Sequence, residues 1–381
     1  MLLLKKHLRR CLFIVQTFLM ISSTSCDREY SLYQPTKIVT FNEGECLDTL
    51  LGYKIDYDSL NVQTGIECVD SFVIVLGERD GAIFSVINAY NDSLVSQFGM
   101  YGHSKSEFLN STDMCQFIHT KNDGILMCVQ DFELDNISVY DLKASIKKRK
   151  TVFEKSLSYK IDKSKVWNYR CFLLDSNNYL LYKGLSSEGD ARDRFTVPPC
   201  FTVHSKYKEF TFSVYPSAIQ TGDNHFMDRM YAELPRISPN MKKVVEMFAY
   251  VNLFTIVDLD TYKTIGVMGE RSHGLEYYQQ LAKDKKGKEL YKSVFIHNVA
   301  FNVSDNYIIV CQDGNTPVSR FEDLFKYKPH VLFFDWDGNM LFSFCVNDPL
   351  MRIAYNDMSK KLYGLTNNGD LYGYDLSKYF Q

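Results

Sequence analysis

A short phrase that recurs at the end of apolar segments constrains the fold of this chain more than any other feature. Its copies read Val-Tyr-Asp-Leu at 139–142, Ile-Val-Asp-Leu at 256–259, Phe-Phe-Asp-Trp at 333–336 and Gly-Tyr-Asp-Leu at 373–376. Each copy follows another apolar segment of strand length and, where the chain continues, precedes a turn and a further strand. Such self-similarity indicates that one four-stranded unit repeats along the chain.

Six such units can be laid out, and they predict an all-β, six-bladed β-propeller. Their strands span residues 66–99, 114–156, 167–215, 236–268, 298–346 and 352–376. Four-stranded units that repeat at roughly this spacing are typical of propellers. The alternative is a pair of β-sandwich domains. A sandwich pair would show a linker or a shift in composition near the middle of the chain, and neither occurs.

The last unit contains only three predicted strands and would leave an unpaired sheet edge. Natural sheets rarely leave such an edge exposed. The segment Lys37-Ile38-Val39-Thr40-Phe41 has the alternation of an edge strand and precedes the first complete unit. We therefore expect this N-terminal strand to complete the last blade and close the ring.

The first residues predict export and lipidation. Residues 1–25 combine a basic beginning with an apolar run at 11–21 that is too short to cross a bilayer, as in a signal peptide. Small residues then lead to Cys26, as in the lipobox of bacterial lipoproteins. An ordinary signal peptide with an incidental cysteine is the alternative. The predicted organisation is a signal peptide at 1–25, a lipidated tether at 26–36 that attaches to the membrane through Cys26, and a propeller at 37–381.

Composition and charge exclude several classes of function. The chain is 45% hydrophobic and 14% aromatic, and its formal charge of -3 argues against a nucleic-acid partner. The one dense basic run, at 147–150, is interpreted as a solvated turn between strands. Eight cysteines remain besides Cys11 and Cys26, with no Cys-x-x-Cys pair, so no zinc site is expected. The sequence leaves the disulfide state of these eight cysteines open.

Two segments carry a resemblance to a known family. Residues 99–108, Gly-Met-Tyr-Gly-His-Ser-Lys-Ser-Glu-Phe, and 237–243, Ile-Ser-Pro-Asn-Met-Lys-Lys, resemble the crossover and turn motifs of the TolB-like six-bladed β-propeller lipoproteins of Bacteroidetes. The resemblance covers most of residues 32–381. It implies a propeller that a lipid anchors in the cell envelope, at the outer membrane on either its periplasmic or its surface side. The family has no agreed catalytic residues to transfer, so the resemblance implies neither an activity nor a cofactor.

Loop lengths indicate which face of the propeller binds a partner. Short turns join the first strand to the second in every unit. The long segments, at 99–112, 185–199, 216–234, 269–297 and 313–330, all belong to connections that open on the other face. Long loops carry function more often than tight turns do. We expect helices at 275–292 and 320–327 on this face, and the candidate interaction residues are His103, Glu107, Tyr278 and Phe321. The alternative is that the helices only cap the ring.

No catalytic or metal motif is present, and no cofactor is expected. The histidines are scattered singly, although His103, Glu107 and His273 lie on loops that could meet over the axis. The function predicted is therefore a non-enzymatic lipoprotein that binds an envelope protein or a glycan. A saccharide hydrolase or lyase is the alternative. The only tryptophans, Trp167 and Trp336, lie in predicted strands, which favours a protein partner over a glycan.

Overall fold

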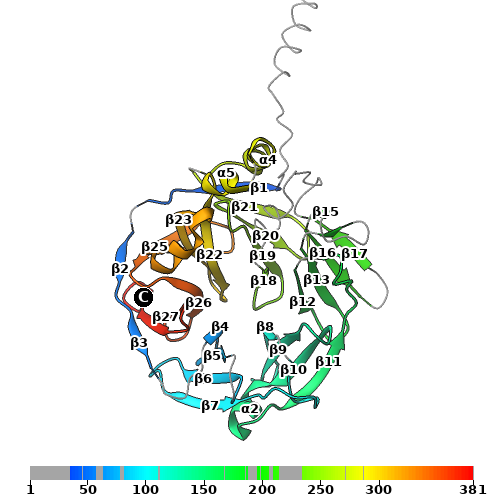
Figure 1. Cartoon of the computed structure of the whole chain (residues 1–381). Helices are drawn as coiled ribbons and strands as arrows, with labels where there is room; N and C mark the ends of the chain where they lie inside the picture. Colours follow the sequence, from blue (N-terminus) through cyan, green and yellow to red (C-terminus); the bar gives the residue numbers. More distant parts are fainter. Residues whose placement is uncertain are drawn as a thin grey trace, which may run out of the picture.

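The computed structural model describes the backbone of residues 35–380 except 45, 57–62, 78–80, 110–111, 167, 185, 188–194, 198, 206–208, 214–233, 271 and 286. Its strands form six four-stranded blades around a common axis, which confirms the predicted six-bladed β-propeller (Figure 1). Two blades carry one further strand each. A separate pair, β14 (Ser186–Ser187) and β15 (Phe195–Val197), lies outside the blades.

The first three blades follow one another along the chain. Blade 1 consists of β4 (Gln63–Val69), β5 (Phe72–Gly77), β6 (Phe84–Asn88) and β7 (Leu94–Phe98). Blade 2 consists of β8 (Thr112–His119), β9 (Ile125–Asp131), β10 (Asn136–Asp141) and β11 (Phe153–Ser158). Blade 3 consists of β12 (Tyr169–Leu173), β13 (Tyr179–Lys183), β16 (Cys200–His204) and β17 (Glu209–Phe212).

The last three blades complete the ring. Blade 4 consists of β18 (Arg236–Ile237), β19 (Lys243–Met247), β20 (Leu253–Asp258) and β21 (Thr264–Gly269). Blade 5 consists of β22 (Phe295–Val303), β23 (Ile308–Pro317), β24 (His330–Phe334) and β25 (Met340–Val346). Blade 6 contains β26 (Leu350–Asn356), β27 (Lys361–Thr366) and β28 (Leu371–Asp375). In every blade the first strand lies nearest the axis (Figure 1).

An N-terminal segment closes the ring, but with a different strand from the one predicted. β3 (Tyr53–Ile55) pairs antiparallel with β28 and is the fourth strand of blade 6. The predicted strand, β1 (Lys37–Phe41), instead pairs parallel with β21 at the outer edge of blade 4. β2 (Asp48–Leu50) pairs parallel with β25 of blade 5. Alternation shows that a segment can form an edge strand, but not which edge it joins, so the prediction of Lys37–Phe41 as the closing strand was wrong.

These three strands form a belt around the outside of blades 4, 5 and 6, visible in blue in Figure 1. Each strand buries one apolar side chain under the edge that it covers. Phe41 is 4% exposed and its ring centroid lies 5.0 Å from that of Phe334, while Ile55 is 7% exposed. Burial of a large apolar side chain contributes about 2 kcal/mol. The belt is therefore part of the core rather than a loose tail.

The hydrophobic core lies between neighbouring blades. One cluster joins Val73 and Val75 of blade 1 to Ala354 and Tyr363 of blade 6, across the seam where the two ends of the ring meet. Similar clusters join blades 1 and 2, blades 2 and 3, and blades 4 and 5. A blade cannot bury both of its faces alone, so the strands read as apolar runs and each blade depends on its neighbours.

The repeated aspartates close the turns that leave the third strand of a blade. Asp258 accepts hydrogen bonds from the backbone N–H and the hydroxyl of Thr261, both at 2.7 Å. Asp375 accepts one from the Ser377 N–H at 2.8 Å, and these bonds lower the pKa of both carboxyls. Asn88 takes the same place in blade 1 and accepts from the Tyr90 N–H at 2.9 Å. A side-chain acceptor two or three residues upstream replaces a backbone turn bond, which explains the repeat.

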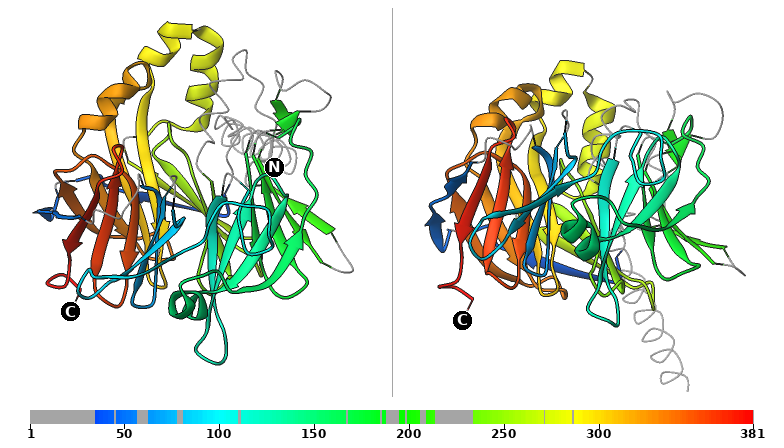
Figure 2. Two further views of the ribbon diagram at one scale, coloured as in Figure 1. Left: turned by 60° about the horizontal axis from the view of Figure 1, so that its bottom comes forward. Right: turned by 90° about the horizontal axis from the view of Figure 1, so that it is seen from below.

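Helices lie at both ends of the ring (Figure 2). The face on which the long segments open, called the long-loop face, carries α4 (Leu275–Asp284), α5 (Gly287–Lys292) and the 3-10 helix η1 (Val318–Lys326). The opposite end, the tight-turn face, carries α2 (Leu142–Lys148). The predicted helix at 275–292 is confirmed, but it is broken before Gly287, whose φ is +53°. No helix in the described residues is long and apolar enough to cross a membrane.

The helix α2 was not predicted, because its sequence was read as a solvated turn. Asp141, the repeated aspartate of blade 2, caps its N-terminus by accepting from the Ala144 N–H at 2.8 Å. Arg149 ends the helix in a left-handed conformation, with φ +52°. Lys147 and Lys148 thus occupy the last turn and Arg149 the C-terminal cap, where positive charge stabilises the helix.

Candidate functional site

The helices of the long-loop face pack onto blades 4 and 5 and cap that part of the ring. Their inward side chains join the largest hydrophobic cluster of the protein, among them Tyr278, Leu281, Ala282, Leu290 and Leu324. Exposed aromatic side chains on this face are fewer. Tyr277 of α4 is 41% exposed and Phe321 of η1 45%, and Phe295 at the start of β22 is 40% exposed. The helices are therefore a structural cap that also presents apolar surface.

The structure places the four predicted interaction residues in three different environments. Phe321 is exposed on η1, as expected for a contact residue. Tyr278 is only 4% exposed, so the expectation that it forms part of the interaction surface is corrected. Successive residues of a helix point about 100° apart, which turns Tyr277 outward when Tyr278 faces the core. The sequence pattern identified the helix but assigned the wrong tyrosine to its surface.

His103 and Glu107 lie at the outer edge of blade 2. They line a hollow with Asp131, Phe153 and Ser156. Glu107 accepts a hydrogen bond from the Ser104 N–H at 2.9 Å, and this bond lowers the pKa of its carboxyl. Phe108 holds the loop that carries His103 and Glu107 at this outer edge. Its side chain is 1% exposed and packs between the rings of Phe84 and Tyr140.

His273 is not part of that hollow. Its ring stacks on Tyr277 of α4, with centroids 4.0 Å apart. In Figure 1, α4 and blade 2 lie on opposite sides of the ring. The hypothesis that His103, Glu107 and His273 meet over the axis is therefore wrong. Packing of Phe108 between blades 1 and 2 holds the first loop at the perimeter.

The axis of the ring contains two cavities. The cavity nearer the long-loop face, called the long-loop cavity, has a volume of about 310 Å³. The cavity nearer the tight-turn face, called the tight-turn cavity, has a volume of about 120 Å³. Both are lined by residues of the first strands of the blades. The residues shared by the two linings are Glu67, Met114 and Arg236. Arg236 forms an ion pair with Glu67, so this pair separates the two cavities.

The long-loop cavity is rich in arginine. Arg170 on β12, Arg236 on β18 and Arg352 on β26 line it, together with the carboxylates Asp113 and Glu67. Arg170 pairs with Asp113, and its side chain is only 4% exposed. Arg352 is exposed, and its Nη1 donates to the Met351 carbonyl at 2.8 Å. Three guanidinium groups thus converge from three different blades.

The tight-turn cavity has the opposite charge. Among its described lining residues are Asp70, Asp305 and Asp357, and the one imidazole among them is that of His119. The His119 Nε2 lies 3.6 Å from the Asp70 carboxylate. Burial, reinforced by the charge of Asp357, raises the pKa of Asp305. The two cavities of one axis therefore favour ions of opposite sign.

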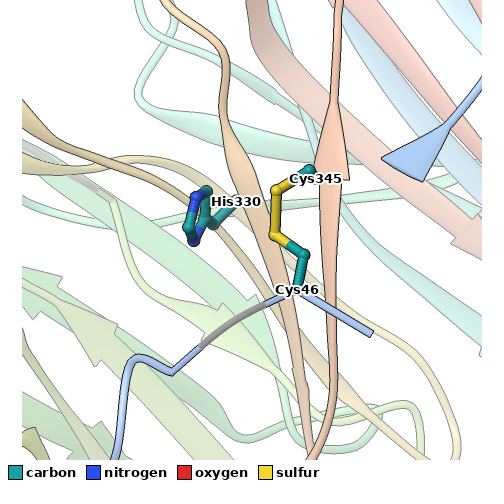
Figure 3. Close-up of side chains that lie close together, drawn as sticks. All are labelled: Cys46, His330 and Cys345. Carbon is teal, nitrogen blue, oxygen red and sulfur yellow. A yellow bond between two sulfur atoms is a disulfide. The ribbon is translucent and has the colours of Figure 1, made fainter. Parts of the chain in front are cut away.

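One group of described residues has the composition of a metal site. The sulfurs of Cys46 and Cys345 and a nitrogen of His330 lie within 4.8 Å of one another (Figure 3). The two cysteines form a disulfide, which occupies both of the thiolates that a metal would need. The arrangement as it stands is a covalent link between the belt and β25, with His330 beside it on β24. Elsewhere in the described residues, no three such side chains lie this close.

Sequence reasoning missed the arginines of the axis, and a weak signal for them existed. Arg170, Arg236 and Arg352 each lie in the first strand of a unit that is otherwise apolar. A charged residue inside an apolar strand is a candidate functional residue. Only the closed ring shows that these three positions face one cavity, because they are far apart in the chain. Arg236 follows Arg170 by 66 residues (236 − 170), and Arg352 follows Arg170 by 182 residues (352 − 170).

Comparison with known proteins identifies no family. No family model matches the sequence, and no curated protein matches it. The β-propeller domain of Cps50 (Swd1) from Myceliophteria thermophila is 9% identical, with a TM-score of 0.40, and the match covers 86% of this chain and 100% of that one. A chain of the mitotic checkpoint complex is 8% identical, with a TM-score of 0.38, and the match covers 92% of this chain and 97% of that one. At these identities and TM-scores, neither structure bears on the function of this chain.

Proposed function

We propose that this protein is a membrane-tethered, non-enzymatic β-propeller of the bacterial cell envelope that binds a partner protein through its long-loop face. The tether is the lipidated Cys26, which lies outside the described residues, and the membrane is the outer membrane. The family we propose is the TolB-like group of Bacteroidetes propeller lipoproteins, on the strength of the motifs at 99–108 and 237–243.

The asymmetry between the two faces carries this proposal. The long-loop face bears the helices α4, α5 and η1, and Tyr277, Phe295 and Phe321 expose apolar surface there. Exposed aromatic residues are enriched in protein interfaces. A protein is favoured over a glycan because Trp336, the tryptophan that the structure describes, is half-buried and donates its indole N–H to the Asp305 carbonyl at 3.1 Å.

The disulfide between Cys46 and Cys345 supports export. Disulfides persist in oxidising compartments such as the periplasm and the cell surface and are rare in the cytosol. In the part of the chain that the structure describes, six further cysteines are free and at least half-buried. A saccharide hydrolase or lyase is not favoured, because His103 and Glu107 lie at the perimeter rather than over the axis.

Photo-crosslinking tests the binding face. A photoreactive amino acid replaces Tyr277 in one variant and Tyr262, which is 39% exposed on the tight-turn face, in the control. Both variants are expressed with the signal sequence and irradiated in the native envelope. We expect a protein adduct from position 277 and none from position 262. Adducts from both positions, or none from either, would overturn the proposal for this face.

Membrane attachment is tested separately. A Cys26→Ala variant cannot accept acyl chains at that position, so we expect it to appear in the soluble envelope fraction, while the parent protein sediments with membranes. Metabolic labelling with an alkyne fatty acid should mark the parent protein alone. Equal labelling of both proteins would show that Cys26 is not the lipidated residue.

A further inference from the structure

We infer that the long-loop cavity binds an organic anion, a single carboxylate carried on a compact apolar body. This site lies inside the ring, and it stands whether or not the helices of the long-loop face bind a protein. The inference depends on the charges, the size and the walls of the cavity.

The arginines of the cavity differ in how they are neutralised. Arg170 donates to Asp113 and, at 2.9 Å, to the Pro235 carbonyl. Arg236 donates to Glu67, whose other oxygen accepts from the Asn302 amide at 2.9 Å. Arg352 forms no ion pair with any described residue and donates only to a backbone carbonyl. Two guanidinium groups are thus paired and fixed in place, and the third presents unused donors.

Charge arithmetic specifies a monoanion. The three arginines carry three positive charges and the two carboxylates two negative ones, so the described residues of the lining have a net charge of +1, from 3 − 2. Charges in a cavity with protein walls interact more strongly than charges in bulk water. A single bound carboxylate restores neutrality. Its two oxygens match the fork of N–H groups of one guanidinium, here Arg352.

The apolar walls and the volume of the long-loop cavity determine which body can carry the carboxylate. Apolar residues complete the lining, among them Leu76, Phe132, Phe301 and Ile353. A volume of about 310 Å³ is at the lower limit of ordinary ligand pockets, which begin near 300 Å³. The cavity therefore suits a short aliphatic or aromatic acid and not an oligosaccharide. The ligand enters from the long-loop side, because the Arg236–Glu67 pair closes the other end and the tight-turn cavity beyond it is acidic.

Calorimetric titration tests the inference. The probes are phenylacetate and hexanoate, with phenylacetamide as the neutral analogue. A short peptide with an apolar C-terminal residue is the second source of the same chemistry, and its C-terminal amide is the matched control. We expect binding of at least one carboxylate and none of the neutral analogues. Binding of the peptide acid but not of the small acids would assign the site to a chain terminus.

Variants locate the binding. Arg352→Gln removes the unpaired charge and its charge-assisted hydrogen bonds, so it should weaken binding at least about tenfold. Arg352→Lys keeps the positive charge but not the paired N–H groups of the guanidinium. Its affinity for the carboxylate should lie between that of the parent protein and that of Arg352→Gln. Arg320→Gln, an exposed arginine of η1 on the same face, should bind like the parent. Unchanged thermal melting of all three variants verifies that they fold.

Two results would overturn the inference. The first is an absence of binding by the parent protein at carboxylate concentrations up to about 10 mM, well above the range of a specific small-molecule site. The second is equal weakening by Arg320→Gln and Arg352→Gln, which would show a non-specific effect of surface charge.

Discussion

Arg236 of blade 4 forms an ion pair with Glu67 of blade 1, and these two blades stand on opposite sides of the six-bladed ring. The pair therefore spans the axis, where most propeller contacts join only neighbouring blades. It also divides the axial space into a basic cavity and an acidic one. One interaction thus contributes both to the stability of the ring and to the separation of its two ends.

Removal of one partner from this pair should destabilise the protein more than removal of both. The side chains of Arg236 and Glu67 are 16% and 13% exposed, so Glu67→Ala leaves a largely desolvated guanidinium without a carboxylate. We expect a loss of about 3 kcal/mol in the free energy of unfolding, and a smaller loss in a Glu67→Met, Arg236→Met double variant. Urea unfolding of the single and double variants measures the coupling.

The exposed pair Lys54–Asp370 provides the control for that experiment. Its side chains are 45% and 37% exposed, so Lys54→Ala should shift the urea midpoint very little. If Glu67→Ala shifts the midpoint no further than Lys54→Ala does, the axial pair does not stabilise the ring.

Asp92 should be essential for ring closure. Its carboxylate accepts hydrogen bonds from the Tyr53 and Tyr363 hydroxyls, both at 2.8 Å, and pairs with Lys361 at 2.7 Å. These contacts join blade 1 to the closing strand β3 and to β27 of blade 6. Asp92→Ala should lower the free energy of unfolding by about 3 kcal/mol, because three donors lose a carboxylate at a site that is only 17% exposed, and Lys361 and Tyr363 keep only the Tyr90 and Ala89 carbonyls as acceptors.

Asp92→Asn separates the loss of the carboxylate charge from the backbone strain that alanine would introduce at this turn. The φ of Asp92 is +58°, a conformation that asparagine tolerates and alanine does not. The asparagine variant should therefore be intermediate in thermal stability, and hydrogen exchange should increase mainly in β3 and β27. Uniform exchange increases in all six blades would contradict a local role at the seam.

The disulfide between Cys46 and Cys345 should contribute strongly to stability. It joins residues 299 positions apart, and a crosslink across so long a segment lowers the entropy of the unfolded chain, which raises the free energy of unfolding by about 5 kcal/mol. Cys46→Ser and Cys345→Ser should therefore lower the urea midpoint by the same amount, and the double variant should match either single one.

Reducing agent supplies the second arm of this test. It should lower the midpoint of the parent protein to that of Cys46→Ser and leave that variant unchanged. Cys200→Ser, which changes a free and half-buried thiol, should retain the response to reducing agent. A parent protein whose midpoint ignores reducing agent would mean that the link does not constrain the unfolded chain.

Glu246 should make the stability depend on pH. Its side chain lies inside the ring at 1% exposure and accepts from the Tyr182 hydroxyl at 3.0 Å; burial raises its pKa from the ordinary 4.5 to about 7. Between these two values the folded state retains a proton that the unfolded chain has lost. The free energy of unfolding should therefore fall as the pH rises from about 4.5 to about 7, by roughly 3 kcal/mol in total.

Glu246→Gln should remove this dependence, because the amide does not titrate in the window. The comparison is the slope of the unfolding free energy between pH 5 and pH 7, with Glu209→Gln, whose side chain is 63% exposed, as the control. Equal slopes in Glu246→Gln and in the parent protein would show that another group titrates.

The blades could be predicted because strand pattern and turn chemistry are local. The strands at Cys200–His204, Leu253–Asp258 and Lys361–Thr366 lie within the predicted units 167–215, 236–268 and 352–376, since an apolar run between turn residues specifies a strand without reference to distant partners. The same reasoning failed for Lys37–Phe41 and for Tyr278. An edge strand can pair with any free edge, and the side of a helix that is buried depends on the surface it meets.

The sequence by itself determined the four-stranded repeat, the number of blades and the separation of long loops from tight turns, because each depends on residues a few positions apart. Only the tertiary structure decided which strand closes the ring, that Cys46 pairs with Cys345, and that Arg170, Arg236 and Arg352 face one cavity. These relationships join residues tens to hundreds of positions apart. They arise from closure of the ring, which brings the first strands of all the blades to one axis, a placement that local pattern does not specify.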